Sequence, residues 1–199
     1  MAEQLPELIV VDAAAWREWL AAHHDRAPGV WLVLAKGGAT DPTSLTYEEA
    51  VNEALCFGWI DGQARRRDET TSSLRFTPRR ARSIWSKKNV ERVARLTEAG
   101  RLHPAGLAEV ERAKADGRWE AAYAGPATIE VPADLTSALA AQPAAQAMFE
   151  ILTSQNRFAI LHRIHSAKRP ETRARRIAQF VEMLGRGETI YPQRRQAGQ

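Results

Sequence analysis

A basic segment that contains a tryptophan offers the clearest chance of chemistry in this sequence. It runs from Pro78 to Asn89 and surrounds Trp85 with Arg79, Arg80, Arg82, Ser83, Ser86, Lys87 and Lys88. Peptide N–H groups and the dipole at a helix start favour anions, and guanidinium groups bind phosphate or carboxylate at two points. The segment therefore predicts an anion-binding site at a helix N-terminus. The alternative is a solvated basic face, with serine as a plain helix cap and Trp85 buried in the core.

An acidic residue precedes this segment by a short distance. Asp61 and Trp59 flank Ile60, and strand-like alternation would put both on one side, where a carboxylate beside an aromatic ring could face a pocket. Asp61–Gly62 is also a common turn, which is the alternative. Asp61 as a general base would need a partner, for which Asp68, Glu48 and Glu69 are candidates.

These residues together predict a cleft for an anionic small molecule. Its expected lining is Trp59, Asp61, Arg79, Arg80, Ser83, Trp85 and Lys87. An enzyme of unknown reaction that uses Asp61 is a second hypothesis, and no catalytic residue is assigned. The chain has no phosphate-loop glycine pattern, no Gly-x-Ser-x-Gly elbow, no His-Glu-x-x-His and no Cys-x-x-Cys, so no cofactor is predicted.

Binding to a nucleic-acid backbone is a third hypothesis. Arg65, Arg66 and Arg67 alternate along a predicted strand, so at most two of them can join Arg75 and the Arg79 group on one surface. Neutralising several phosphates would give affinity that is independent of sequence and sensitive to salt. No known nucleic-acid motif accompanies these residues.

The last third of the chain carries two weaker candidates. His162 and His165 are three residues apart and share a helical face, but no further ligand completes a metal site, so no metal is predicted. The second candidate, the stretch from Lys168 to Arg176, holds five basic residues around Glu171. Arg173 and Arg176 share a face, which favours either packing of an amphipathic helix or a second anion contact.

Three stretches of the chain resemble one protein family. They are Ala54–Gly62, Arg75–Asn89 and Ala167–Ile177, and they resemble the signature segments of the YdeI/OmpD-associated (OmdA) proteins. Residues 131–187 are similar to the portion for which that family is named. The resemblance implies a link to bacteriocin protection and supplies no established reaction or catalytic residue.

Composition indicates an ordinary globular protein of the cytoplasm. The chain has 199 residues, 44% of them hydrophobic, and no apolar run long enough to span a membrane. The single cysteine, Cys56, lies in an apolar run that predicts a buried thiol, and a lone thiol suits a reducing compartment. The net charge is only +4, but residues 62–101 carry twelve basic and four acidic residues. Such clustering predicts a surface field with a direction.

Local signals predict the elements that must position these residues. Asp12 caps a helix that starts at Ala13, and Val30–Ala35 is a buried central strand. Thr46 with Glu49 forms a capping box, a basic hairpin follows Gly62, and Ser83 or Ser86 caps the next helix. Four more helices are predicted after a linker at residues 124–132.

The sequence thus predicts an α+β fold in two domains, a small sheet with packed helices followed by a C-terminal helical module. The boundaries are residues 1–124 for the α+β domain and residues 125–199 for the helical module.

Overall fold

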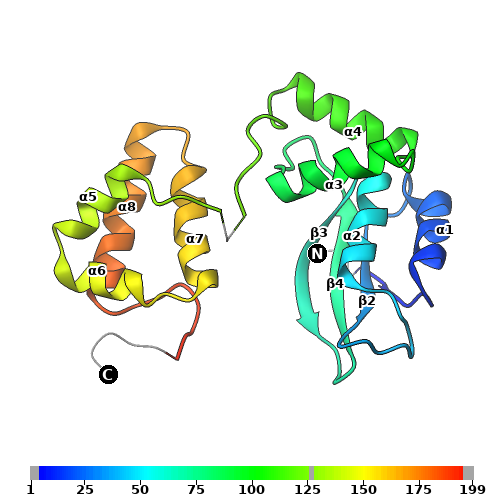
Figure 1. Ribbon diagram of the computed structural model, residues 1–199, viewed down its shortest axis with the longest axis horizontal. Helices are drawn as coiled ribbons and strands as arrows, with labels where there is room; N and C mark the ends of the chain where they lie inside the picture. The colour runs from blue at the N-terminus through cyan, green and yellow to red at the C-terminus, as the bar shows by residue number, and fades with distance from the viewer. Residues whose placement is uncertain (1–4, 126–127, 195–199) are drawn as a thin grey trace. The chain divides into compact units, whose positions relative to one another are not determined.

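The computed structural model describes residues 5–125 and 128–194. The chain divides into two compact units, the first ending at Ala122 and the second beginning at Tyr123. The first unit contains β1 (Glu7–Leu8), α1 (Ala13–His23), β2 (Val30–Ala35), α2 (Tyr47–Cys56), β3 (Trp59–Arg66), β4 (Thr71–Pro78), α3 (Lys87–Glu98) and α4 (Pro104–Ala115) (Figure 1). The second contains α5 (Ala133–Ala140), α6 (Pro143–Glu150), α7 (Ser154–His165) and α8 (Pro170–Gly185). The predicted α+β architecture with a helical C-terminal region is confirmed.

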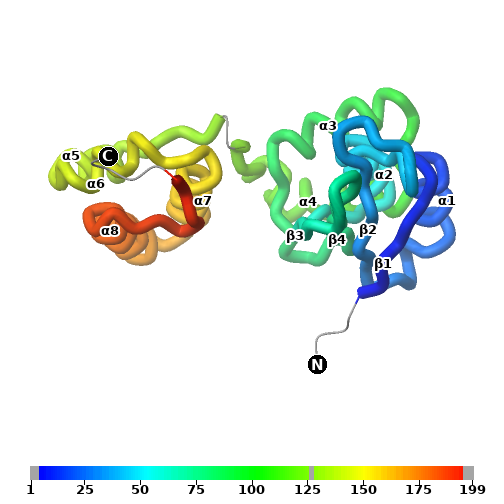
Figure 2. Tube along the Cα trace, turned by 90° about the horizontal axis from the view of Figure 1, so that it is seen from below, coloured from blue at the N-terminus to red at the C-terminus, as the bar shows by residue number. Residues whose placement is uncertain are grey.

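The sheet of the first unit is mixed and has the strand order β1-β2-β4-β3 (Figure 2). β1 runs parallel to β2, while β2 with β4 and β3 with β4 are antiparallel. β2 therefore lies inside the sheet, which confirms the predicted central strand.

One face of the sheet packs against helices and the other is polar. Leu32 and Leu34 of β2 and Leu74 and Phe76 of β4 share one core with residues of the helices, including Trp16 of α1. Side chains alternate along a strand, so the intervening residues of the same strands point to the opposite face. That face carries Glu7, Trp31, Ser73, Arg75 and Arg65.

Side-chain caps begin the helices of the first unit where the sequence predicts them. Asp12 accepts a hydrogen bond from the Ala15 N–H, and Thr46 forms a reciprocal capping box with Glu49. Of the two serines considered for α3, Ser86 is the cap, and its hydroxyl accepts from the Asn89 N–H. Each cap satisfies a peptide N–H that has no partner within the helix.

Two element boundaries differ from expectation. Gly58, with a φ of 73°, ends α2, and Trp59 already begins β3, so the alternative of a turn at Asp61–Gly62 is wrong. Asp61 is a strand residue that pairs with Phe76. In the second unit the sequence predicts helices at residues 143–154 and 158–167. Instead, α6 stops at Glu150 and α7 starts at Ser154, because Thr153 accepts from the Asn156 N–H and begins a new helix.

The four helices of the second unit enclose their own apolar core. Leu135, Met148, Ile160, Leu161 and Ile164 are at most 1% exposed and come from α5, α6 and α7. Ile177, Val181 and Leu184 complete the core from α8. Part of the predicted linker, residues 126–127, lies outside the described residues.

Candidate anion-binding site at the start of α3

Two arginines hold the loop between β4 and α3 from the inside. Arg79 is 5% exposed, its guanidinium lies 3.5 Å from the centroid of the Trp85 ring, and its Nη1 donates to the Ile84 carbonyl at 3.2 Å. Arg118 donates through Nη1 to the neighbouring Ser83 carbonyl at 2.8 Å. Trp85 itself is 1% exposed and meets Trp119 edge-on at 4.8 Å. The loop is therefore fixed by a cation–π contact, two hydrogen bonds and an aromatic pair.

This arrangement orients two peptide N–H groups. The peptide bonds of the loop are trans, and in a planar trans peptide the C=O and the following N–H point in opposite directions. Because the Ser83 carbonyl faces Arg118 and the Ile84 carbonyl faces Arg79, the Ile84 N–H points away from Arg118 and the Trp85 N–H points away from Arg79. Within the described part of the chain, neither N–H has a hydrogen-bond acceptor, and the buried Trp85 indole N–H has none either.

A tight turn precedes these N–H groups and displays two cations. The Arg80 N–H donates to the Ser83 hydroxyl and the Ser83 N–H donates to the Arg80 carbonyl, both at 2.9 Å. Ser83 is therefore a turn residue rather than a helix cap. The side chains of Arg80 and Arg82 are exposed, and no ion pair to a described residue engages them.

The first turn of α3 adds positive charge where a helix disfavours it. Lys87 and Lys88 occupy this turn, which contains no acidic residue. A cation at a helix N-terminus opposes the helix dipole, so an anion nearby would be stabilising. Lys88 lies 3.6 Å from Glu48, whereas Lys87 is exposed and has no ion pair among the residues of the described ranges.

A polar cluster connects α2 with α3 and β3. Arg92, 2% exposed, donates through Nε and Nη2 to the two carboxylate oxygens of Glu48 and through Nη1 to Asn89. Its guanidinium lowers the pKa of Glu48. Beside it, the Tyr47 hydroxyl donates to Asp61 at 3.2 Å. Burial and the Asp61 charge raise the pKa of Tyr47 to about 12, so this hydroxyl stays a donor at neutral pH.

The structure brings only some of the seven predicted site residues together. Arg79 lies over Trp85, Arg80 and Ser83 form the turn between them, and Lys87 follows two residues after Trp85.

Trp59 and Asp61 have other surroundings. Trp59 is 1% exposed, donates to the His24 carbonyl at 3.1 Å and packs edge-on against Trp16. Asp61 is bonded to Tyr47 and to none of the three acids nominated as its partner: Glu48 binds Arg92, Asp68 accepts from the hairpin turn, and no bond joins the described Glu69 to Asp61. A role for Asp61 as a general base stays a prediction.

Several residues of this region escape sequence reasoning. Arg118 and Trp119 come from the segment after α4, and Tyr47, Asn89 and Arg92 come from two helices. Arg118 and Trp119 repeat the combination of arginine and tryptophan found in the loop, which is a weak indication in the sequence that they belong to the same site. The spacing of Asn89 and Arg92, three residues apart, placed them on one helical face.

The hairpin arginines lie mainly on the polar face of the sheet. Arg65 and Arg67 both bind Glu7 of β1, at 3.1 and 3.2 Å, and the Arg65 guanidinium lies 4.3 Å from the centroid of the Trp31 ring. Two of the three consecutive arginines thus share a face, as alternation requires. Glu7 neutralises part of their charge, which weakens the case for a polyanion partner at this face.

The basic stretch of the second unit makes internal contacts. Arg173 binds both carboxylate oxygens of Asp134 on α5, at 2.6 and 2.9 Å, and lowers the pKa of that carboxyl group. Arg173 also donates to the Ile164 carbonyl, and Arg176 donates to the Arg163 carbonyl. These bonds satisfy carbonyls at the end of α7 and tie α8 to α5 and α7.

The two histidines of α7 face different partners. His162 lies edge-on to Tyr123 at 4.8 Å, and burial lowers its pKa. His165 bonds to the Glu130 carbonyl through Nε2 at 2.9 Å. Across residues 5–125 and 128–194, no three His, Cys, Asp or Glu side chains are grouped so that they could hold a metal ion.

These features define a two-unit protein, an α+β unit with a braced basic loop followed by a helical unit with an internally bonded arginine motif. The chain belongs to the family described as Domain of unknown function (DUF8412), which matches residues 8–109. Residues 128–187 are a domain described as Bacteriocin-protection, YdeI or OmpD-Associated, which confirms the resemblance noted from the sequence. No curated protein and no solved structure matches the chain.

None of the helices in the part of the chain that the structure describes has the length and apolar character that crossing a bilayer requires.

Proposed function

We propose that the first unit binds an anionic small molecule at the loop between β4 and α3. The observation that carries the proposal is the set of exposed cations Arg80, Arg82 and Lys87 beside the peptide N–H groups of Ile84 and Trp85, which have no acceptor among the described residues. Peptide N–H groups beside a helix start are hydrogen-bond donors that suit phosphate or carboxylate oxygens. The arginines supply charge and two-point hydrogen bonding.

The contacts that Arg79 and Arg118 make with the loop allow it to bind a ligand without first becoming ordered. Arg79 and Arg118 already hold the backbone, so a ligand need not cover the entropy of fixing it. Arg79 and Trp85 then act on the ligand only indirectly, because both are at most 5% exposed. Arg80, Arg82 and Lys87 are the residues expected to contact it.

Isothermal titration with inorganic phosphate, pyrophosphate and citrate tests this proposal. Binding is expected to weaken at least ~10-fold in the double variant Arg80→Ala/Lys87→Ala, since charge-assisted hydrogen bonds contribute about 1.5–3 kcal/mol each. Arg95→Ala is the matched control, because Arg95 is an exposed cation in the last turn of the same helix. Equal losses in both variants, or no binding by any of the three anions, would contradict the assignment.

Titration of a single-stranded oligonucleotide at rising salt distinguishes binding of a small anion from the alternative, binding of a nucleic-acid backbone. Backbone binding weakens steeply with ionic strength because counterions are released. Tight oligonucleotide binding without binding of the small anions, lost in Arg65→Ala/Arg67→Ala, would move the function to the polar sheet face.

We also propose that the protein works in the cytoplasm. The support is Cys56, the single cysteine, which is 0% exposed and whose thiol pKa is raised by burial. A buried, protonated thiol is unreactive and forms no disulfide within the chain, which is compatible with a reducing compartment. Cell fractionation of the tagged chain tests this directly, and recovery outside the cytoplasm would refute it.

A further inference from the structure

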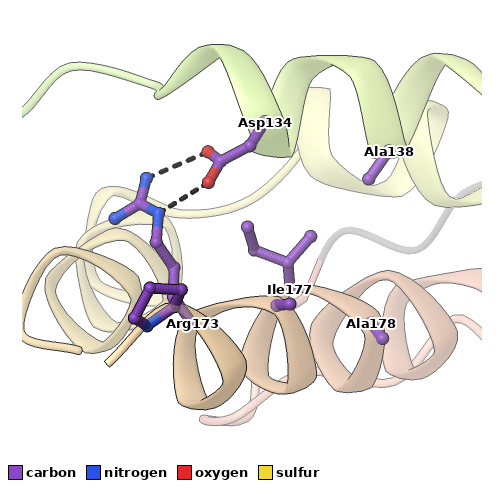
Figure 3. A pocket seen from close by; sticks show the side chains of 7 residues that line it. Asp134, Ala138, Arg173, Ile177 and Ala178 are labelled. Carbon is purple, nitrogen blue, oxygen red and sulfur yellow. Dashed lines mark hydrogen bonds and ion pairs between the residues drawn. The ribbon is translucent and has the colours of Figure 1, made fainter. Parts of the chain in front are cut away.

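An apolar groove lies between α5 and α8 in the second unit. It has a volume of about 460 Å³ and is lined by Asp134, Ala138, Pro170, Arg173, Ala174, Ile177 and Ala178. Figure 3 shows Asp134 and Ala138 on α5 opposite Arg173, Ile177 and Ala178 on α8. Ile177 forms the floor at 7% exposure, while Ala174 and Ala178 are exposed on α8. Small side chains on both helices thus leave room for one large aliphatic side chain from outside.

The polar end of the groove is closed by a bond that is already complete. Arg173 and Asp134 bind each other at two points (Figure 3). Nη1 of Arg173 donates to the Ile164 carbonyl. The two opposite charges of this pair compensate each other. The groove therefore offers apolar contact, and charge recognition must come from its surroundings.

Those surroundings are positive. Between Arg163 and Val181 the chain has six basic residues and one acidic residue, Glu171. Three of the basic residues, Arg163, Arg173 and Arg176, bond to groups within the unit. The other three are exposed and have no ion pair among the described residues, and they are Lys168, Arg169 and Arg175.

Two of these cations adjoin the groove lining in sequence. Arg169 directly precedes Pro170, and Arg175 directly follows Ala174. The start of α8 has no side-chain cap, and its dipole contributes positive potential that Glu171 in the first turn offsets in part.

From this combination we infer that the α5–α8 groove docks an acidic peptide segment of a partner protein. An aliphatic side chain of that segment fills the space over Ile177, and carboxylates beside it face Arg169 and Arg175. Such interfaces commonly combine an apolar anchor with a charged rim. The buried anchor contributes most of the affinity, and the rim charges speed association. The groove belongs to the second unit alone, so this inference is independent of the anion site proposed for the first.

Fluorescence anisotropy of the full chain with short labelled peptides tests the inference. The probe is a peptide with leucine flanked by glutamates, compared with versions in which serine replaces leucine or lysine replaces glutamate. Ala178→Leu fills the groove from an exposed position and is expected to weaken binding of the acidic leucine peptide at least ~10-fold. Ala144→Leu, at an exposed position on α6, is the matched control and should leave binding unchanged.

Arg169→Glu tests the role of charge. It should weaken binding of the acidic leucine peptide and strengthen binding of the peptide in which lysine replaces glutamate. Circular dichroism of each variant confirms that the helices remain. Absence of binding by the acidic peptide, or equal binding by wild type and Ala178→Leu, would overturn the inference. Binding to phosphatidylglycerol vesicles that Ala178→Leu leaves unchanged, without peptide binding, would assign the cations to a membrane surface instead.

Discussion

The Arg92 guanidinium binds both carboxylate oxygens of Glu48, with Nε 2.9 Å from Oε1 and Nη2 2.5 Å from Oε2. The pair joins α3 to α2, and its two members differ in environment, because the Arg92 side chain is 2% exposed and that of Glu48 is 49% exposed. Loss of the carboxylate charge therefore leaves a buried cation whose other contacts include Asn89 and the Tyr47 ring, neither of which is charged.

Replacing Glu48 by Gln is expected to lower the free energy of unfolding of the first unit by about 1–2 kcal/mol, a value reduced for the exposure of Glu48. Tryptophan fluorescence in urea measures it, because all six tryptophans precede residue 122. Arg92 lowers the pKa of Glu48, so the contribution is present above the unfolded pKa of 4.5 and disappears as the pH falls below it.

Glu111→Gln is the control for this substitution, because Glu111 forms an exposed pair with Lys114 on α4. It should change stability by less than ~0.5 kcal/mol. A loss as large as that of Glu48→Gln would show that the burial of Arg92 is not the cause.

Gly106 on α4 lies directly against the end of α2. A Cβ at this position would stand 2.2 Å from the Cys56 carbonyl oxygen, a backbone atom that cannot move without shifting α2. Gly106→Ala is therefore expected to destabilise the first unit by about 2–3 kcal/mol despite the better helix propensity of alanine, because overpacking outweighs it.

Urea unfolding followed by tryptophan fluorescence gives the size of the effect. The comparison is Gly185→Ala near the end of α8, where the nearest atom to the new Cβ is the flexible Gln142 side-chain oxygen at 3.3 Å. The stability of Gly185→Ala, followed by far-ultraviolet circular dichroism in urea, should be unchanged or slightly higher. A stable Gly106→Ala protein would mean that α4 packs less tightly against α2.

Local signals in the sequence predict most of this fold. Capping at Thr46 and Ser86, the apolar run of β2 and the glycine and proline residues that end helices act within a few residues, so they can be read without the tertiary structure. The turn considered as an alternative at Asp61–Gly62 does not form, for a long-range reason. Pairing of Asp61 with Phe76 extends β3, and that contact outweighs the turn preference of Asp-Gly.

The site could be predicted only in part, because residue type does not reveal exposure. Arg79 and Arg80 are neighbours of the same type, yet Arg79 is buried over Trp85 and Arg80 is exposed. The bond between Arg118 and Ser83 joins residues 35 positions apart, and no spacing rule indicates it. Sequence reasoning locates the basic loop, and tertiary contacts decide which of its cations can meet a ligand.

His103 couples the stability of α4 to pH. Its Nδ1 accepts a hydrogen bond from the Ala105 N–H and caps the helix, which requires that this nitrogen carry no proton. Burial, His24 and Arg17 lower the pKa of His103 below its ordinary 6.5. The unfolded chain therefore binds the proton first, and the stability of the first unit should fall as the pH drops through 6.5 toward the lower folded pKa.

His103→Asn keeps a good helix cap without a titrating group. Its free energy of unfolding should fall less between pH 7 and pH 5 than that of the wild type, as measured by urea unfolding at each pH. A wild-type slope that survives the substitution would place the titration at another residue.

Arg79 and Arg80 are expected to respond in opposite ways to the same truncation. Arg79→Ala removes a buried cation from the face of Trp85 and leaves the Ile84 carbonyl without its donor, so it should destabilise the first unit by about 2–3 kcal/mol. Arg80→Ala removes an exposed side chain whose backbone, not its guanidinium, makes the turn, so stability should change by less than ~0.5 kcal/mol. Urea unfolding measures stability, and phosphate titration of each variant measures binding. If Arg80→Ala loses affinity while it keeps stability, the exposed cation binds the ligand; if only Arg79→Ala loses affinity, and in proportion to its unfolding, the loop has a structural role alone.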